Sequence, residues 1–225
     1  MGRGKLIVIE GTDGSGKQTQ SERLVERLRG ESYSCEVLGF PRYDTPTGKI
    51  VGEACLGKEL GMGSGGVFPN FAKLDPRVAC HYYAADRLDA VPEIERLLNE
   101  NDFVILDRYV ESNMGHQCGK IDDKTERDLM RDWIVDLEYN VNGLPQPDLI
   151  IFLYMPLKVS RRLKEGMNEK LDAHEADEEH LRNAEAAYLE LAEYYGWDKV
   201  ECSQDNENPR DIQDIHEEVY SLMRE

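Results

Sequence analysis

A glycine-rich stretch near the N-terminus carries the residue types that bind phosphate. It reads Gly11-Thr12-Asp13-Gly14-Ser15-Gly16-Lys17-Gln18-Thr19, and it lies between the apolar run 6–9 and a helix-like run from 18 to 28. Glycines allow backbone N–H groups to turn towards phosphate oxygens, and both the helix N-terminus and Lys17 add positive charge. The stretch predicts a P-loop that binds the phosphates of ATP, the alternative being a plain glycine-rich turn.

One position departs from the P-loop pattern G-x-x-x-x-G-K-[ST]. The pattern places a Mg²⁺-ligating hydroxyl directly after the lysine, but this chain has Gln18 there and Thr19 one residue later. Backbone groups form the phosphate cradle, so the departure concerns only the ligands of the metal.

Charged side chains follow the predicted strands, where an open parallel sheet binds its ligands. Asp107 ends the apolar run 103–106, where a P-loop enzyme places a carboxylate that supports Mg²⁺, although it could also cap a neighbouring segment. Arg42, Arg87 and Arg108 stand in an otherwise acidic chain. Each alone could be a paired surface cation. Together they predict a second anionic ligand beside ATP, because the guanidinium fork matches phosphate.

Aromatic side chains lie close to these arginines in the sequence. Phe40 and Tyr43 flank the first, Tyr82 and Tyr83 precede the second, and Tyr109 follows the third. A nucleobase could stack on such rings, whereas ordinary core packing is the alternative.

A polar segment follows the fourth predicted strand. Residues 166–178 contain few apolar side chains and come after Arg161, Arg162 and Lys164. A flap with cations at this place would close over the transferring phosphates and exclude water. The pattern predicts a short lid at 161–178, the alternative being an acidic surface loop.

The composition limits the partners and the compartment. The chain has 225 residues and a formal net charge of −18, so neither nucleic acid nor an anionic membrane is an expected partner. Its five cysteines are scattered and form no C-x-x-C pair, which indicates a reducing cytosol rather than a zinc site or a disulfide framework. No leader-like or membrane-spanning run is recognised, so a cytoplasmic location is predicted.

Strand-like and helix-like runs alternate along the chain. The predicted strands are 6–10, 35–40, 103–106, 149–154 and 199–202. Helices are predicted at 47–60, from 75 through a bend or break near Pro92 to 98, at 124–139, and after a cap at Asn208-Pro209. The alternation predicts one doubly wound α/β domain over residues 1–225, with a five-stranded parallel sheet and helices on both faces.

Four sequence blocks together resemble the thymidylate kinase family. They are IEGTDGSGK at 9–17, FPRY at 40–43, YAADR at 83–87 and DRYVESN at 107–113, in the family's order and at about its spacing. Pro147-Asp148 and the run 187–192 extend the resemblance over nearly the whole chain. The resemblance implies transfer of the γ-phosphoryl group of ATP to dTMP, with Mg²⁺ as cofactor, by a homodimer.

The resemblance also implies roles at the phosphates. The P-loop residues Gly11 to Thr19 would bind ATP, and Asp13 would hold the 3′-hydroxyl of the acceptor sugar. Arg42 and Arg108 would bind the acceptor phosphate, and Arg162 would be a lid cation. The catalytic residues would be Lys17, Asp13, Arg108 and Arg162.

At the acceptor base, Tyr83 would stack on thymine and Arg87 would bond its O4. Asn113 and Gln117 would read the other edge, with Phe40-Pro41 near the methyl group. The implied substrate-binding residues are Asp13, Phe40, Pro41, Arg42, Tyr43, Tyr83, Arg87, Arg108, Ser112, Asn113, His116 and Gln117.

The implied metal residues are Asp107 and Glu175. Besides Gln18, two features depart from the family. His116 stands where an aromatic residue, usually tyrosine, rejects ribonucleotides, and the glycine-rich stretch 57–66 looks like an insertion.

Two alternatives remain open at this point. Another P-loop kinase, acting on dUMP, CMP or a deoxynucleoside, would share the P-loop and the lid. A non-catalytic nucleotide-binding switch would need no second phosphate site, and the three arginines argue against it.

Overall fold

The computed structural model describes residues 2–224 except 63–66, 69–70, 168–176 and 206. Glu175, half of the predicted lid and part of the glycine-rich stretch 57–66 therefore lie outside the described residues.

Five parallel strands form the central sheet, which confirms the predicted fold class. Their order across the sheet is β2-β3-β1-β4-β5. The strands are β1 (Lys5–Gly11), β2 (Cys35–Gly39), β3 (Phe103–Asp107), β4 (Leu149–Tyr154) and β5 (Asp198–Glu201). Ile9 of β1 pairs with Asp107 of β3, and Gly11 pairs with Leu153 of β4, so the P-loop and Asp107 leave the same edge of the sheet.

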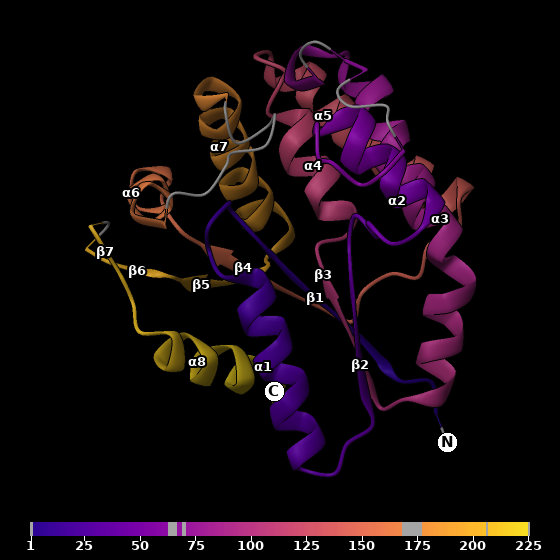
Figure 1. Ribbon diagram of the computed structural model, residues 1–225, viewed down its shortest axis with the longest axis vertical. Coiled ribbons are helices and arrows are strands. Elements are labelled where there is room, and N and C mark those ends of the chain that lie inside the picture. The colour runs from indigo at the N-terminus through magenta and orange to yellow at the C-terminus, as the bar shows by residue number, and fades with distance from the viewer. Residues whose placement is uncertain (1, 63–66, 69–70, 168–176, 206, 225) are drawn as a thin grey trace.

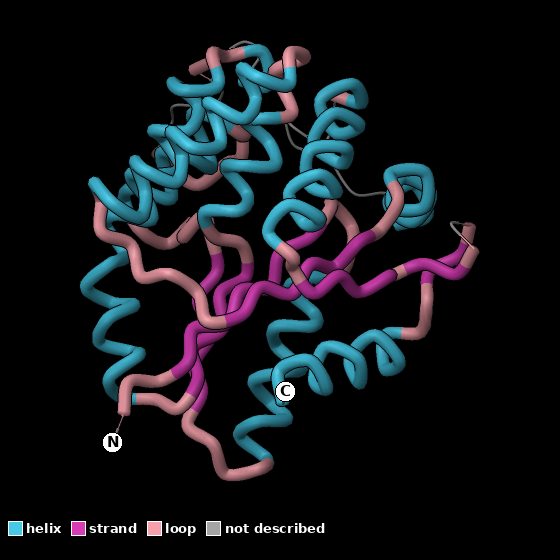
Figure 2. Tube along the Cα trace, turned by 180° about the vertical axis from the view of Figure 1, so that it is seen from behind, coloured by secondary structure: helices cyan, strands magenta, loops and turns pink. Residues whose placement is uncertain are grey.

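Helices cover both faces of this sheet, as Figures 1 and 2 show. They are α1 (Lys17–Gly30), α2 (Pro46–Ile50), α3 (Pro76–Glu100), α4 (Val110–Cys118), α5 (Lys124–Val135), α6 (Leu157–Met167), α7 (Glu178–Tyr195) and α8 (Ile212–Arg224). Side chains alternate between the faces of a strand. Leu6 and Val8 pack with α3, α4, α5 and α7, whereas Ile7 and Ile9 pack with α1 and α8.

Short irregular elements complete the chain. Two π-helical segments, η1 (Val51–Cys55) and η3 (Asp136–Val141), continue α2 and α5, and η2 (Phe71–Lys73) is a 3₁₀ turn. The strands β6 (Ser203–Gln204) and β7 (Asn208–Pro209) form an antiparallel hairpin before α8. Within the described residues, no helix combines the length and the apolar character needed to cross a bilayer.

Two predicted helix boundaries were wrong, and the helix predicted to bend or break near Pro92 does not break there. The helix α3 begins at its predicted cap, where Asp75 accepts from the backbone N–H groups of Arg77 and Val78, but it runs through Pro92 without a break. Ala90 and Ile94 on either side of the proline are buried, and this packing outweighs the lost hydrogen bond.

The helix predicted at 47–60 ends at Cys55, just before Gly57, which has a φ of 70°. The last helix is not capped by Asn208-Pro209, because these residues pair with β6. Asp211 takes that place and accepts from the backbone N–H of Gln213 at 2.7 Å.

Candidate active site

The P-loop joins β1 to α1 and leaves the first turn of α1 open to an anion. Gly14 and Gly16 have φ values of 76° and 85°, which favour glycine. A Cβ at Gly14 would also lie 2.8 Å from the Cβ of Ser160. Gly16 is the N-cap of α1 and has no side chain to occupy the N–H groups of that turn. The loop therefore has the backbone of a phosphate cradle.

Lys17 lies across this loop and is buried. Its Nζ donates to the carbonyl oxygens of Gly11 and Thr12, both at 2.9 Å. Burial and the nearby Arg108 lower the pKa of Lys17 to about 8, although Asp13 and Glu10 counteract this shift. The ammonium is thus fixed at the mouth of the cradle by the loop itself.

Two other P-loop side chains point away from the cradle. The hydroxyl of Thr12 bonds to the backbone O and N of Met155 at 2.7 and 2.8 Å, which ties the loop to the end of β4. Gln18 is exposed and donates to Glu22 at 2.9 Å along α1. The departure at Gln18 therefore places an outward-facing side chain where the pattern has a metal-ligating hydroxyl.

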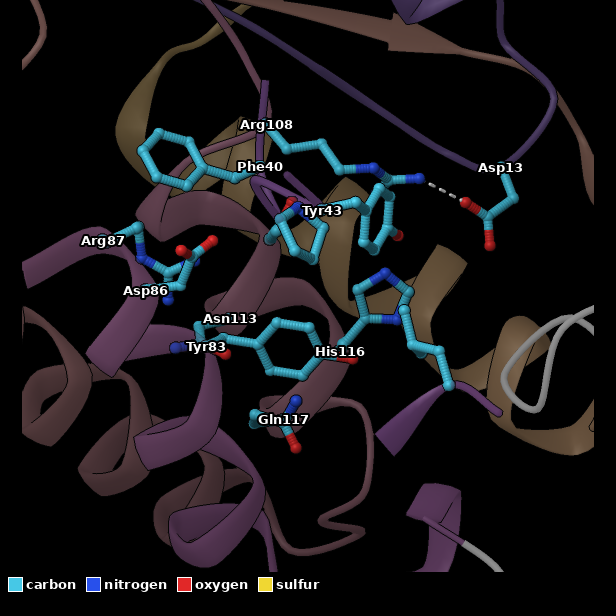
Figure 3. A pocket seen from close by; sticks show the side chains of 13 residues that line it. Asp13, Phe40, Tyr43, Tyr83, Asp86, Arg87, Arg108, Asn113, His116 and Gln117 are labelled. Carbon is cyan, nitrogen blue, oxygen red and sulfur yellow. Dashed lines mark hydrogen bonds and ion pairs between the residues drawn. The ribbon is translucent and has the colours of Figure 1, made fainter. Parts of the chain in front are cut away.

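A pocket with an empty volume of ≈ 670 Å³ opens beside the P-loop. All of the predicted acceptor residues except Arg42 line it, together with Leu56 and Asp86 (Figure 3). Loops and helices that follow β1, β2 and β3 supply these side chains, as expected at the carboxyl edge of a parallel sheet.

Asp13 and Arg108 form an ion pair between the P-loop and this pocket, drawn as the dashed line in Figure 3. Nη2 of Arg108 donates to Oδ1 of Asp13 at 2.7 Å. Burial would lower the pKa of Arg108, but Asp13 and other acids raise it well above its usual value. Burial likewise opposes the charge of Asp13, yet Arg108 and Lys17 hold its pKa well below its usual range. Both groups are therefore charged.

The far end of the pocket contains a buried ion pair that the sequence analysis did not identify. Arg87 donates through Nε and Nη2 to the two carboxylate oxygens of Glu138, both at 2.6 Å. The π-helical segment η3 presents Glu138, which is 0 % exposed. Nδ2 of Asn113 donates to the same carboxylate at 2.7 Å. Glu138 thus holds two of the predicted base-reading residues in place.

Gln117 is also buried in this region, but its amide is not engaged. Neither its Nε2 nor its Oε1 has a hydrogen-bond partner among the described residues. A buried amide without partners costs stability, so such groups are rare unless a ligand supplies the bonds. This arrangement suits recognition of a polar base edge.

Two imidazoles meet at the side wall of the pocket. Nδ1 of His116 lies 3.2 Å from Nε2 of His180, and the rings are stacked with centroids 5.3 Å apart. Burial and the neighbouring Lys120 lower the pKa of His180 to about 4, so this ring is neutral at physiological pH. His180 lies in the first turn of α7, 64 residues away in sequence, and no local pattern in the sequence indicated it.

Asp107 is the one predicted metal residue that the structure describes. It ends β3, and its buried Oδ1 has no hydrogen-bond partner among the described residues. Burial raises its pKa, whereas Lys17 and Arg108 act in the opposite direction. Mg²⁺ usually binds one or two carboxylates and completes its shell with water and substrate phosphates, so a carboxylate with one buried oxygen left unbonded by the described residues fits it.

Arg42 is the predicted acceptor residue that does not line the pocket, and its role at the acceptor phosphate stays a prediction. Its buried guanidinium bonds to the carboxylates of Asp86, Asp89 and Glu93 at 3.2, 2.6 and 3.5 Å. Three carboxylates of α3 therefore occupy the fork that was predicted to bind the acceptor phosphate.

Arg162 also lies away from the pocket, on the exposed face of α6. Its Nη2 donates to the backbone oxygen of Glu207, and Asn208 Oδ1 is 3.4 Å away. Lys158 donates to the carboxylate of Glu207 at 2.6 Å. The predicted lid cation is held by the β6–β7 hairpin in this structure.

Comparisons with known proteins agree on one family. The family model described as thymidylate kinase matches residues 9–219. The thymidylate kinase of Mycobacterium tuberculosis is 30% identical over 197 residues, covering 85% of this chain and 87% of that protein. A probable thymidylate kinase of Pyrococcus horikoshii is 30% identical and covers 99% of this chain and 97% of its own. The solved thymidylate kinase of Candida albicans has a TM-score of 0.72 at 25% identity, covering 99% and 92%.

Proposed function

Since the chain belongs to the thymidylate kinase family, we propose that the Asp13–Arg108 pair marks the point where its two substrates meet. The enzyme transfers the γ-phosphoryl group of ATP to dTMP and yields dTDP and ADP. The observation that carries the proposal is the convergence of the acceptor residues on one pocket that shares Asp13 with the P-loop. Formation of dTDP from γ-labelled ATP and dTMP tests it, and failure of label to appear in dTDP would refute it.

The P-loop would hold the phosphates of ATP through its backbone N–H groups, with Lys17 on the β and γ oxygens. Arg108 would bind the acceptor phosphate, and Asp13 would orient both Arg108 and the 3′-hydroxyl. The attacking oxygen already belongs to an anionic phosphate, so a strong general base is not required. Positioning and charge neutralisation by Lys17 and Arg108 would then supply most of the catalysis.

Mg²⁺ would be held near Asp107, directly or through water, and would neutralise charge on the β and γ oxygens of ATP. The unpaired Oδ1 of Asp107 supports this assignment. Glu175 would contribute from the lid, as would Arg162 after leaving the hairpin. We also assign Arg42 to bracing the loop after β2 against Asp86, besides its predicted role at the acceptor phosphate.

At the base, Tyr83 would stack on thymine, with Phe40, Pro41 and Tyr43 closing the pocket and Ser112 on its floor. Arg87, Asn113 and Gln117 would bond the edge of the base. The support for these roles is that all eight side chains line the same pocket.

A homodimer in the cytoplasm is also proposed. Two apolar side chains of α3, Val78 and Leu88, are 43% and 45% exposed and would suit a subunit contact. All five cysteines are free and buried, in keeping with a reducing compartment. Sedimentation at micromolar concentration would give twice the chain mass, and a monomer at all concentrations would refute the dimer.

Gln117→Met is expected to separate stability from substrate binding. The substitution removes a buried amide without partners, so the free energy of unfolding should stay unchanged or rise by up to about 1 kcal/mol. The value of kcat/KM for dTMP should fall by about ten- to a hundredfold, because bonds to the base are lost. Exposed Gln146 provides the control as Gln146→Met. Lower stability with unchanged kcat/KM would contradict the role of Gln117.

His116→Tyr is expected to sharpen discrimination against a ribose. An imidazole leaves more room at the 2′ position than a phenol. A site that does not crowd an added hydroxyl rejects it by about a hundredfold at most, whereas a tyrosine ring that crowds it should reject it more strongly. The ratio of kcat/KM for dTMP and ribothymidine monophosphate should therefore increase in the variant. His81→Tyr, at an exposed position on α3, should leave the ratio unchanged. An unchanged ratio in His116→Tyr would leave His116 as a packing residue against His180.

A further inference from the structure

A buried carboxylate lies beneath the active site at a position where the strand pattern calls for an apolar residue. Glu10 is the penultimate residue of β1 and is 0 % exposed. Side chains alternate along a strand, so Glu10 continues the row of Leu6 and Val8, which belong to the core below α3, α4 and α7. A buried carboxylate is tolerated only with hydrogen-bond and charge partners, and its partners indicate what it does.

Four polar groups from four parts of the fold surround this carboxylate. Its Oε1 accepts from the backbone N–H of Gly11 at 3.0 Å and from the hydroxyl of Tyr188 at 3.2 Å. Its Oε2 accepts from the hydroxyl of Ser112 at 2.8 Å. Nη1 of Arg108 lies 4.0 Å from Oε1. Glu10 thus contacts the P-loop, the acceptor helix α4, the helix α7 and the catalytic arginine.

The position of Tyr188 depends on a glycine in α4. A Cβ at Gly115 would lie 2.4 Å from the phenol ring, so the glycine allows Tyr188 to pack directly against α4. The ring also stacks on Phe152, with centroids 5.6 Å apart. Tyr188 is 1% exposed and has little freedom to move, so its hydroxyl is a fixed donor to Glu10.

Arg108 lies between two carboxylates, that of Glu10 in β1 and that of Asp13 in the P-loop. Nη2 donates to Asp13 and Nη1 faces Glu10. The residue itself has a φ of 68°, and its N–H donates to the carbonyl of Ile9 in β1 at 3.1 Å. Asp13 alone fixes one arm of the guanidinium, whereas a second charge is needed to set the plane of the fork. A guanidinium whose plane is wrongly oriented cannot donate two parallel hydrogen bonds to a phosphate.

We propose that Glu10 is a positioning residue for phosphoryl transfer, which sets the plane of the Arg108 guanidinium and ties that plane to the P-loop, α4 and α7. The proposal rests on the proposed role of Arg108 at the acceptor phosphate. Glu10 touches neither substrate and acts only through Arg108 and the elements that it joins.

The test is a double-mutant cycle of Glu10→Gln and Arg108→Lys, read as kcat and as KM for each substrate. Glutamine keeps the shape but loses the charge, and its amide nitrogen cannot accept from Ser112 or Tyr188. Glu10→Gln alone should lower kcat by about tenfold or more and leave the KM for ATP within about twofold. In the Arg108→Lys background, the same substitution should change kcat by less than about twofold, because the fork is already lost.

Glu111, another buried glutamate, provides the matched control. Glu111 of α4 is 2% exposed and accepts from the hydroxyl of Tyr139 at 2.9 Å, and within the described part of the chain it forms no ion pair with Arg108. Glu111→Gln should leave kcat within about twofold in both backgrounds. Equal effects of Glu10→Gln with and without Arg108 would overturn the proposal, since a structural role alone predicts additivity.

If Glu10→Gln does not fold, the cycle is repeated with Glu10→Asp, which keeps the charge but withdraws it from Nη1. The same coupling is expected, and additivity again overturns the proposal. The two proposals can fail separately. If the wild type makes dTDP and Arg108→Lys loses turnover, the proposed function stands. Additive effects of the Glu10 and Arg108 substitutions would then refute only the role of Glu10.

Discussion

Lys17→Ala is expected to abolish phosphoryl transfer while the protein remains folded. The ammonium is buried at the mouth of the P-loop, where no other described lysine reaches the loop carbonyls. Without Lys17, the negative charge on the β and γ oxygens of ATP would lack a neighbouring cation, so kcat should fall by about a thousandfold or more. The measurement is kcat with saturating ATP and dTMP, together with the thermal unfolding midpoint.

Lys5→Ala provides the control for this substitution, because Lys5 begins β1, the strand before the P-loop, and is exposed. The control should keep wild-type turnover. Near-wild-type turnover in a folded Lys17→Ala variant would refute the assignment of the P-loop, whatever the acceptor proves to be.

Arg108→Lys is expected to lower turnover by about ten- to a thousandfold. Lysine keeps the charge near Asp13 but cannot offer the two parallel bonds of the guanidinium to a phosphate. Both residues carry a Cβ, so the cost of the positive φ at this position is the same in the two proteins. The effect should therefore appear in kcat, with an unfolding midpoint close to that of the wild type.

Arg96→Lys is the matched control, since Arg96 lies on the exposed face of α3 and pairs only with Glu100 among its described neighbours. It should not change turnover. An unchanged rate in Arg108→Lys would mean that the acceptor phosphate binds elsewhere, and Arg42 would then be the next residue to replace.

The sheet and the position of the site could be predicted because their signals are local. An apolar strand, a glycine-rich loop and a charged residue at a strand end are each recognised from a few neighbouring residues. The parallel sheet brings those strand ends to one edge, so Asp13, Tyr83, Arg108 and Gln117 were expected near one another, and they line one pocket.

The residues that the sequence analysis missed are partners of buried groups over long separations. Glu138 is 51 residues from Arg87, and Tyr188 is 178 residues from Glu10. An acid in a helix or a strand has the same local pattern whether it faces solvent or a buried cation. Only the packing of helices on the sheet decides which acids become buried partners.

The same reason explains the partners of Arg42, which the sequence did not indicate. Arg42 follows a strand end, as a phosphate ligand would, but Asp86 and Asp89 are one turn apart on α3 and face it directly. The carboxylates of Asp86 and Asp89 accept hydrogen bonds from the Arg42 guanidinium in the structure. Tertiary packing likewise outweighs local propensity at Pro92, where α3 continues without a break.

The central claim is that dTMP is the acceptor of the phosphoryl group. The most direct test is kcat/KM from coupled ADP release, measured with ATP and a panel of dTMP, dUMP, CMP and thymidine. We expect dTMP to exceed every other acceptor by about tenfold or more, because dUMP lacks the methyl group, CMP presents a different base edge and thymidine lacks the acceptor phosphate. A higher kcat/KM for dUMP, CMP or thymidine, or ADP release that does not depend on dTMP, would contradict the account.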